Sequence, residues 1–460
     1  MVKPHMPSSD ISKKQVNRAS IWITLGHFSS QGIRLLSNLV LTRILAPEMF
    51  GVMALVFTII TALNMMTDLG IKQAVVQNKK GDNDLFLKAA WTMQVIHGVV
   101  VSIFLLVFGM IMLIYIQPAM VVYKNAYAHP DLPIALIIMA IVPVITGFNS
   151  IKIAQCSRKV QLGKLVLIEL LAAISGIAVM LVYAQYSTDI LVLIYGSIVS
   201  ALVKMALSHL YLSGVSIGFA FNKELFKEIY TFGKWIVVSS VMGFLINSGD
   251  KLILGIWITS SALGFYSIAV ILASFIKQLV EKFISTLFFP MLSSALRKLD
   301  DKNDIKPLYY SIRFKVDTFC CFSAGFIYGI SDLLISVLYD ERYQDVSAIL
   351  KILSFGCIWI GFQLAGQLLL ADGKSKKLSS IAFFQALSLY LFMPLAYYLF
   401  GFYGAVWAVA LNPFIRFLVS SYYMKKLFFF DVYKEARGLV FYPVGALLAY
   451  FITITTSNFI

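Results

Sequence analysis

The sequence predicts an all-α polytopic membrane protein, built as two six-helix lobes around a central cavity plus one C-terminal helix, about 13 transmembrane helices in all. Three observations predict this fold: an apolar composition, basic residues that alternate from loop to loop, and a parallel internal repeat. Of the 460 residues, 59% are hydrophobic and 13% are charged, whereas soluble domains carry roughly 25% charged residues. Polar surface is therefore too scarce to coat soluble domains, and lipid is the expected solvent.

The apolar residues form runs of about 20, the length that a helix needs to cross a bilayer. A membrane β-barrel would instead show alternating stretches of about ten residues. The expected spans are residues 19–44, 51–76, 88–114, 132–153, 163–184, 189–212, 231–256, 264–290, 313–337, 345–371, 378–400, 403–424 and 438–458.

These spans are expected to fall into five consecutive regions. They are a cytoplasmic N-terminal tail (1–18), an N-lobe of spans 1–6 (19–212), a cytoplasmic inter-lobe loop (213–230), a C-lobe of spans 7–12 (231–427) and an extra C-terminal helix (428–460). Two lobes of this kind suit alternating access around a site between them.

Basic residues set the expected orientation, because cytoplasmic loops retain Lys and Arg. With the N-terminus in the cytoplasm, the inner segments hold most of the 38 Lys and Arg residues, and the outer loops hold Lys124 and Arg342. The net charge of +15 is then a consequence of topology, and we expect no nucleic-acid partner.

The repeat is visible where a short outer turn opens an apolar helix. Residues 46–55 share this layout with residues 259–268, and at the same offset Asp68 matches Glu281 and Arg34 matches Asn247. Both copies run in the same direction, which predicts lobes related by an axis along the membrane normal.

Polar residues inside the spans are candidates for function, because burying them in lipid is costly. The first span carries His27, Gln31, Arg34 and Asn38 on one helical face. The matching seventh span carries Asn247, Asp250 and Lys251. We interpret both faces as the lining of the cavity, with Arg34 as its deepest cation. The alternative is a hydrogen-bonded seam between helices.

Further polar candidates lie in other spans. Lys204 and Arg416 are additional intramembrane cations and join the expected substrate-binding set. Asp68, His97 and Glu281 are candidate ion-coupling residues, although Asp68–Lys72, Lys277–Glu281 and Arg313–Asp317 could equally be local pairs that anchor helix ends. Because cations outnumber acids among the deep positions, the expected passenger is an anion such as a phosphate ester.

The sequence lacks the nucleotide-binding and zinc-protease motifs that would indicate an enzyme. The end of a P-loop is resembled by Gly373, Lys374 and Ser375, but Leu368 stands where the motif needs glycine. The HExxH motif does not occur, and no soluble loop is long enough to fold into a catalytic domain. We therefore expect no cofactor, no metal and no ATPase, and a secondary-type transporter rather than an enzyme.

Two stretches resemble a known family. The segment LTRILAPEMFG at residues 41–51, and DLGI at 68–71 followed by VVQ at 75–77, are similar to segments of polysaccharide-transport flippases. These flippases export O-antigen and exopolysaccharide and belong to the multidrug/oligosaccharidyl-lipid/polysaccharide exporter superfamily. Many relatives have fourteen spans with both ends inside, one more than is expected here.

The resemblance implies a function. The passenger would be undecaprenyl-diphosphate-linked oligosaccharide, moved from the cytoplasmic to the periplasmic leaflet of a bacterial inner membrane, with the polysaccharide polymerase machinery as a candidate partner. Arg34 would hold the diphosphate. The alternatives are a cation-coupled multidrug exporter of the same superfamily and a membrane glycosyltransferase or polymerase. The first predicts an acid-rich cavity and the second a catalytic outer loop, and the sequence favours neither.

Overall fold

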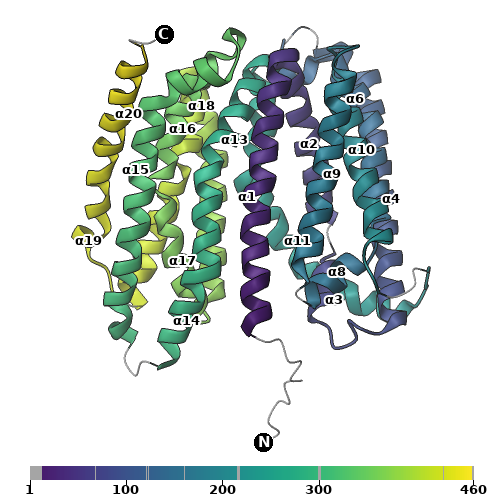
Figure 1. Ribbon diagram of the computed structural model, residues 1–460, viewed down its shortest axis with the longest axis horizontal. Helices are drawn as coiled ribbons and strands as arrows, with labels where there is room; N and C mark the ends of the chain where they lie inside the picture. The colour runs from purple at the N-terminus through teal and green to yellow at the C-terminus, as the bar shows by residue number, and fades with distance from the viewer. Residues whose placement is uncertain are drawn as a thin grey trace, which may run out of the picture.

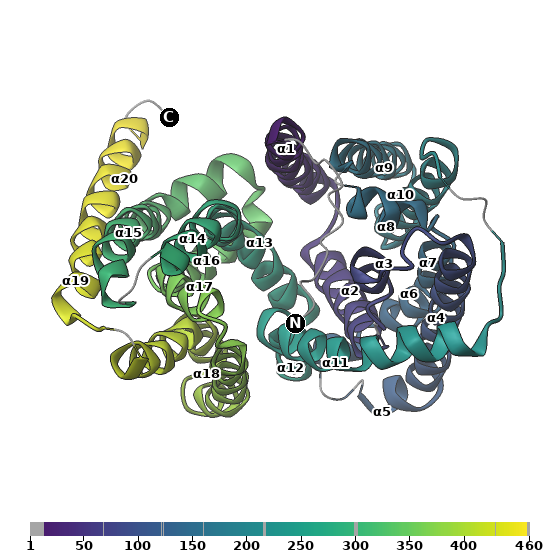
Figure 2. The same ribbon diagram turned by 90° about the horizontal axis from the view of Figure 1, so that it is seen from below.

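The computed structural model describes residues 13–67, 69–120, 122, 124–159, 161–214, 218–298, 302–427 and 429–457, and all regular elements within them are helices. The helices stand roughly parallel in two groups (Figure 1). Seen from below, α1, α12 and α13 lie near the middle of the molecule, and α11 runs along the edge of the helices that include α2 and α4 (Figure 2). We call the end at which α1 begins the proximal end, and the end that carries the α1–α2 turn the distal end.

The first group holds the helices up to residue 210. They are α1 (Lys13–Ile44), α2 (Pro47–Thr67), α3 (Ile71–Gln77), α4 (Asp84–Ile111), α5 (Gln117–Met120), α6 (Asp131–Met139), α7 (Ile141–Gly147), α8 (Lys152–Arg158), α9 (Leu162–Tyr183) and α10 (Leu191–Leu210). A π-helical turn, Met112–Ile116, joins α4 to α5.

The later helices include the second group. They are α11 (Lys223–Asn247), α12 (Gly249–Trp257), α13 (Ser260–Phe283), α14 (Phe289–Lys298), α15 (Lys306–Leu338), α16 (Asp345–Cys357), the 3-10 turn η7 (Ile360–Phe362), α17 (Gln363–Ala371), α18 (Ser375–Leu427), α19 (Val432–Ala436), the 3-10 turn η8 (Arg437–Val440) and α20 (Phe441–Ser457).

Within the described residues, nine helices are long and apolar enough to cross a membrane, or eleven if each bent pair is one span. The helix α18 is in fact two helices, because Gly401 leaves the helical region with φ 66° and turns the chain back. Its halves match the expected spans 378–400 and 403–424. The 32-residue α1 covers the expected first span. The protein is therefore a multi-pass membrane protein, and its helices are consistent with about 13 spans.

Several expected spans are broken where one continuous helix was predicted. The second span divides into α2 and α3, because Gly70 adopts the left-handed conformation that glycine reaches at little cost (φ 58°). The tenth divides at η7, and the seventh at Ser248. Hydropathy does not register such breaks, since the broken segments stay apolar throughout.

The internal repeat becomes a physical contact where α2 crosses α13. Ser261 and Glu48 are 213 residues apart, the offset between the two copies, and the Ser261 hydroxyl donates to Glu48 Oε1 over 2.7 Å. Counterparts of a repeat can touch in this way only on the axis that relates the copies. This contact therefore lies on the predicted axis between the lobes.

Two glycines make the same crossing close. A Cβ atom on Gly51 would overlap the carbonyl oxygen of Ser260, and one on Gly264 would overlap that of Pro47. These pairs are again related by the repeat, so each helix presents the same small residue to the other. Glycine lets the two backbones approach to contact distance.

Further bonds join the two groups at the distal end. The Tyr343 hydroxyl donates to the Leu45 carbonyl over 2.8 Å, Tyr127 donates to Leu252 O over 3.0 Å, and the Asn125 amide donates to Ile256 O over 3.0 Å. Together with the α2–α13 crossing, we call these contacts the distal seam. The largest cluster of buried apolar side chains surrounds the seam.

The helix α11 contacts both groups. Near its proximal end, Glu228 accepts hydrogen bonds from Asn78 and Lys80 of the first group. Near its distal end, the Leu245 carbonyl accepts from Tyr390 of α18 over 3.3 Å. The predicted lobe boundaries at residues 212 and 231 remain predictions.

Candidate transport cavity

A cavity of about 500 Å³ opens among the later helices. Its walls come from α12, α13, α16, η7, α17, the last turn of α11 and both halves of α18, with Gln31 of α1 added from the first group. Apolar side chains such as Ile271, Leu353 and Leu389 alternate with polar ones around it. An apolar lining with a small number of polar groups is typical of a ligand-binding cavity.

Three basic side chains line the cavity: Lys251, Lys277 and Arg416. The Lys277 ammonium donates to Asn247 Oδ1 over 2.8 Å, and Arg416 Nε donates to Gln385 Oε1 over 3.1 Å. Both partners are neutral amides, which orient the cations without cancelling their charge. The unused donors of both groups remain suited to an anion.

Two acidic side chains share the cavity. Asp250 is buried and accepts from the Tyr266 hydroxyl, while Glu281 accepts from the Gln363 amide over 2.8 Å. Among the described residues that line the cavity, three bases against two acids leave an excess of positive charge. Among the described residues, no group of three His, Cys, Asp or Glu side chains could hold a metal ion.

Residues 40–348, from the last turn of α1 to the first turn of α16, match a known family profile described as "Polysaccharide biosynthesis protein". The chain belongs to the polysaccharide biosynthesis protein family. Its match spans more than half of the chain and includes the stretch at 41–51. The resemblance noted in the sequence is thereby confirmed.

Curated relatives of this polysaccharide biosynthesis protein carry related names. It is 20% identical to the lipopolysaccharide biosynthesis protein WzxC of Escherichia coli over 72% of this chain and 65% of WzxC, which is less than two thirds of that protein. It is 24% identical to the capsular polysaccharide biosynthesis protein CapF of Staphylococcus aureus, over 85% of this chain and 94% of CapF.

Solved structures share its fold. The lipid II flippase MurJ, in an inward closed conformation, gives a TM-score of 0.70 at 14% identity over 95% of this chain and 93% of MurJ. An inward-facing multidrug resistance transporter of the MATE family gives 0.63 at 14% identity, over 86% of this chain and 94% of its own. At such identities the likeness concerns the fold alone.

In this family member, the structure brings six of the predicted site residues to one cavity. They are Gln31, Asn247, Asp250, Lys251, Glu281 and Arg416. Gln31 donates to Gln278 of α13, so α1 contacts the cavity wall directly. Asp68 and the side chains of His27 and Arg34 lie outside the described residues.

The other candidates lie apart from the cavity lining. Lys204 of α10 pairs with Glu169 of α9 at 3.4 Å. His97 Nε2 meets the Thr67 hydroxyl at 2.7 Å. Asn38 is half-buried on α1. Their expected roles remain predictions.

Lys277 is a cavity residue that the sequence reading assigned to a helix-end pair with Glu281. In the structure Lys277 donates to Asn247 and Glu281 accepts from Gln363, while Lys277 and Glu281 still interact electrostatically. One signal was available: Ser274, Lys277, Gln278 and Glu281 form a polar stripe along α13. Gln363 and Gln385 lie in segments with fewer polar residues, and neither was predicted from the sequence as a site residue.

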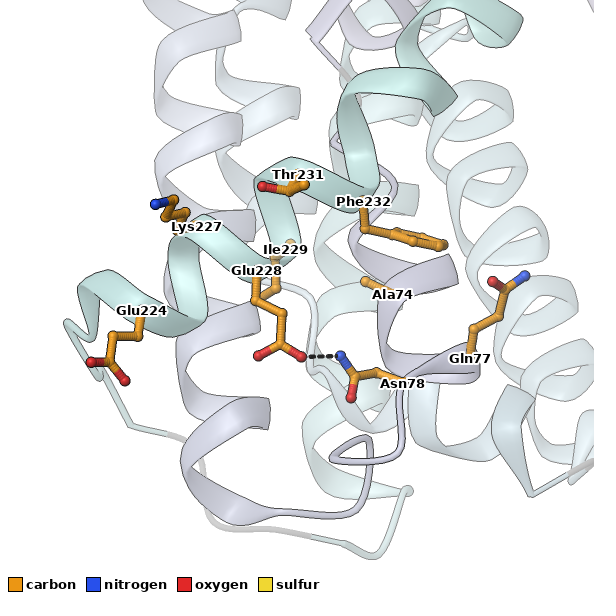
Figure 3. Close-up of a pocket in the computed structure, with 9 residues that line it drawn as sticks. All are labelled: Ala74, Gln77, Asn78, Glu224, Lys227, Glu228, Ile229, Thr231 and Phe232. Carbon is orange, nitrogen blue, oxygen red and sulfur yellow. Dashed lines mark hydrogen bonds between the residues drawn. The ribbon is translucent and has the colours of Figure 1, made fainter. Parts of the chain in front are cut away.

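A second pocket, of about 670 Å³, opens at the proximal end between α3 and α11 (Figure 3). Glu224, Lys227 and Phe232 of α11 line it together with Gln77 and Asn78 of the first group. The hydrogen bond from Asn78, followed by that from Lys80, lowers the pKa of the Glu228 carboxyl on its wall. A carboxylate that stays charged keeps this contact between α3 and α11 intact at neutral pH.

Proposed function

We propose that the protein is a lipid-linked oligosaccharide flippase. It moves undecaprenyl-diphosphate-linked O-antigen or exopolysaccharide repeat units from the cytoplasmic to the periplasmic leaflet of a bacterial inner membrane. Family membership supports the class of passenger. The names of WzxC and CapF connect two relatives with lipopolysaccharide and capsule synthesis, and the polysaccharide polymerase machinery is the proposed partner.

The cationic cavity is the observation that carries the proposal. A diphosphate that leaves water needs charge compensation, and Lys251, Lys277 and Arg416 supply it from three different helices. Arginine binds phosphate oxygens through its planar fork, and lysine acts as a point charge. Amides such as Gln385 and Gln363 suit sugar hydroxyls, since an amide both donates and accepts.

Alternating access is the proposed transport cycle, with the N-terminus in the cytoplasm. The distal seam closes the two groups at one end, which supports a state whose cavity is reached from the proximal end. Opening outward then requires the seam to separate and the groups to tilt about it. The cycle contains no covalent step, so no catalytic residue is proposed.

Lipid extraction from a strain that lacks the gene tests the passenger directly. We expect a completed undecaprenyl-linked repeat unit to accumulate, measured by mass spectrometry, and surface polysaccharide to disappear. Complementation with the intact gene should reverse both effects. If neither changes, the proposed passenger is wrong.

A cation-coupled multidrug exporter of the same superfamily is the second candidate. Asp250 and Glu281 in the cavity are the observation that favours it, since carboxylates suit a cationic drug. This candidate predicts that the deletion strain becomes more sensitive to cationic drugs and dyes while its polysaccharide stays intact. Unchanged drug sensitivity would exclude it.

A further inference from the structure

A buried cluster of charges lies behind the cavity wall, outside the set of cavity residues. Arg313 of α15 is fully buried, and Asp317 and Glu435 are nearly so. Arg313 Nε lies 2.5 Å from Asp317 Oδ2, and Arg313 Nη2 lies 3.3 Å from Glu435 Oε2. We call these three residues the Arg313 cluster. Charges buried this deeply are costly, so the cluster needs a reason beyond stability.

The cluster joins two segments that are distant in the sequence. Arg313 and Asp317 belong to α15, while Glu435 belongs to α19, which leads into the C-terminal helix α20. At two glycines, the backbone of η7 and of η8 comes close to Asp317. A Cβ atom on Gly361 of η7 would overlap its carboxylate, and one on Gly438 of η8 would press on its Cβ atom.

The guanidinium of Arg313 also contacts the helix break itself. Its central carbon lies 3.6 Å above the ring centre of Phe362 in η7, a stacked cation–π contact. The Phe362 ring in turn lies 4.3 Å, centre to centre, from Phe417 of α18. Phe417 follows Arg416, one of the cavity cations. The cluster thus contacts the cavity wall through aromatic rings.

The break has two further connections to the cavity. Ile360 lines it, and Gln363, directly after Phe362, donates to the cavity carboxylate Glu281. Cys357, at the end of α16 before the break, lines the cavity too although it is 3% exposed. A shift of η7 would therefore move groups on both sides of the break.

We propose that Arg313 is a positioning residue of the cavity. With Asp317 and Glu435 it holds the break of the tenth span in place. It thereby sets the positions of Gln363, of Glu281 and of the part of the cavity wall around Arg416. Glu435 comes from the segment before α20, which packs along α15 (Figure 1). The C-terminal helix is thereby part of the transport machinery rather than an appendage.

The exchange Arg313→Lys tests this, because it keeps the buried charge but removes the planar group that reaches both carboxylates and the ring. The parent chain carries Cys156→Ala, Cys320→Ala and Cys321→Ala, so that Cys357 is its one thiol. We expect the variant to keep its abundance, to change the rate at which a small methanethiosulfonate reagent modifies Cys357 several-fold, and to lower flipping about tenfold. Glu435→Gln should shift both readouts in the same direction.

Arg158→Lys is the matched control. Arg158 donates to the carbonyls of Val75, Val76 and Asn78 at the proximal end of the first group. Its exchange removes a comparable set of bonds far from the break, so Cys357 should react at the parental rate even if abundance falls.

Two outcomes overturn the proposal: parental Cys357 reactivity in Arg313→Lys, or a loss of flipping that only follows a loss of protein. The inference rests on the proposed function for its transport readout alone. If the parent flips no lipid-linked oligosaccharide, the proposed function fails, and Cys357 reactivity still decides the role of Arg313.

Discussion

Lys277 and Arg416 hold positive charge in a cavity whose lining also includes apolar and amide groups, Lys251 and the two acids Asp250 and Glu281. Each is oriented by one neutral amide, Asn247 or Gln385, so the pairing does not neutralise either cation. The carboxylate of Glu281 interacts electrostatically with both cations, and an anionic passenger would add to the compensation that cations need in a low-dielectric site. Substitutions that remove the charge of these two residues therefore test their role in binding the passenger.

Arg416→Ala is expected to lower flipping of the lipid-linked oligosaccharide about 100-fold, because one oriented donor to the diphosphate is lost. Arg416→Lys should recover part of the rate, since the charge remains without the fork. The measurement is surface polysaccharide together with the accumulated lipid intermediate, normalised to protein abundance. The control is Lys376→Ala, because Lys376 is an exposed lysine near the start of α18. Normal polysaccharide in Arg416→Ala would remove Arg416 from the mechanism.

At the scale of helices, the interruptions gather around the cavity. The tenth span breaks at η7 and the seventh at Ser248, and residues beside both breaks line the chamber. In α18, Pro413 lacks the N–H that would bond to the Val409 carbonyl, and both residues line the cavity. Broken helices offer backbone groups to a passenger that a regular helix keeps for itself.

The α2–α13 crossing depends on glycine, so Gly264→Ala should destabilise the protein by about 1–3 kcal/mol, as overpacking does. Its new Cβ atom would meet a backbone carbonyl, which cannot turn aside. Gly243→Ala is the matched control, because a Cβ atom there meets nothing within 4 Å, and alanine in a helix should gain about 0.5–1 kcal/mol. Thermal unfolding of both purified variants in detergent compares them. A melting temperature of Gly264→Ala at or above the parental one would contradict the role of the crossing.

At the scale of the whole molecule, the two groups of helices meet on an axis between the repeats, where Glu48 bonds to its counterpart Ser261. The distal seam on this axis consists of a few hydrogen bonds and one close helix crossing. Such an interface can separate as a unit, which a rocking cycle requires.

Cross-linking the seam should stop transport. With Glu48→Cys and Ser261→Cys, a short bis-methanethiosulfonate reagent is expected to abolish flipping, and a reducing agent should restore it. Asp332→Cys with Ser347→Cys is the control, because this hydrogen-bonded pair joins α15 and α16 within one group. Continued flipping by a fully cross-linked seam would rule out alternating access through the distal end.

Sequence alone determined the helical membrane fold, the internal repeat and the family. Each of these rests on local information: the apolar length of a span, the basic residues beside it, and the stretch at 41–51. Gln31, Asn247 and Arg416 could also be predicted as candidate site residues, since a polar group in an apolar helix stands out without knowledge of its neighbours.

Tertiary structure alone decided where these residues meet. It placed the cavity among the later helices, brought Lys277 into a hydrogen bond with Asn247, and joined Arg313 to Glu435 across 122 positions of the chain. Hydropathy cannot supply such facts, because it describes each helix against lipid and not against other helices. Which faces of the helices meet depends on packing between distant segments, including the close approaches at Gly361 and Gly438.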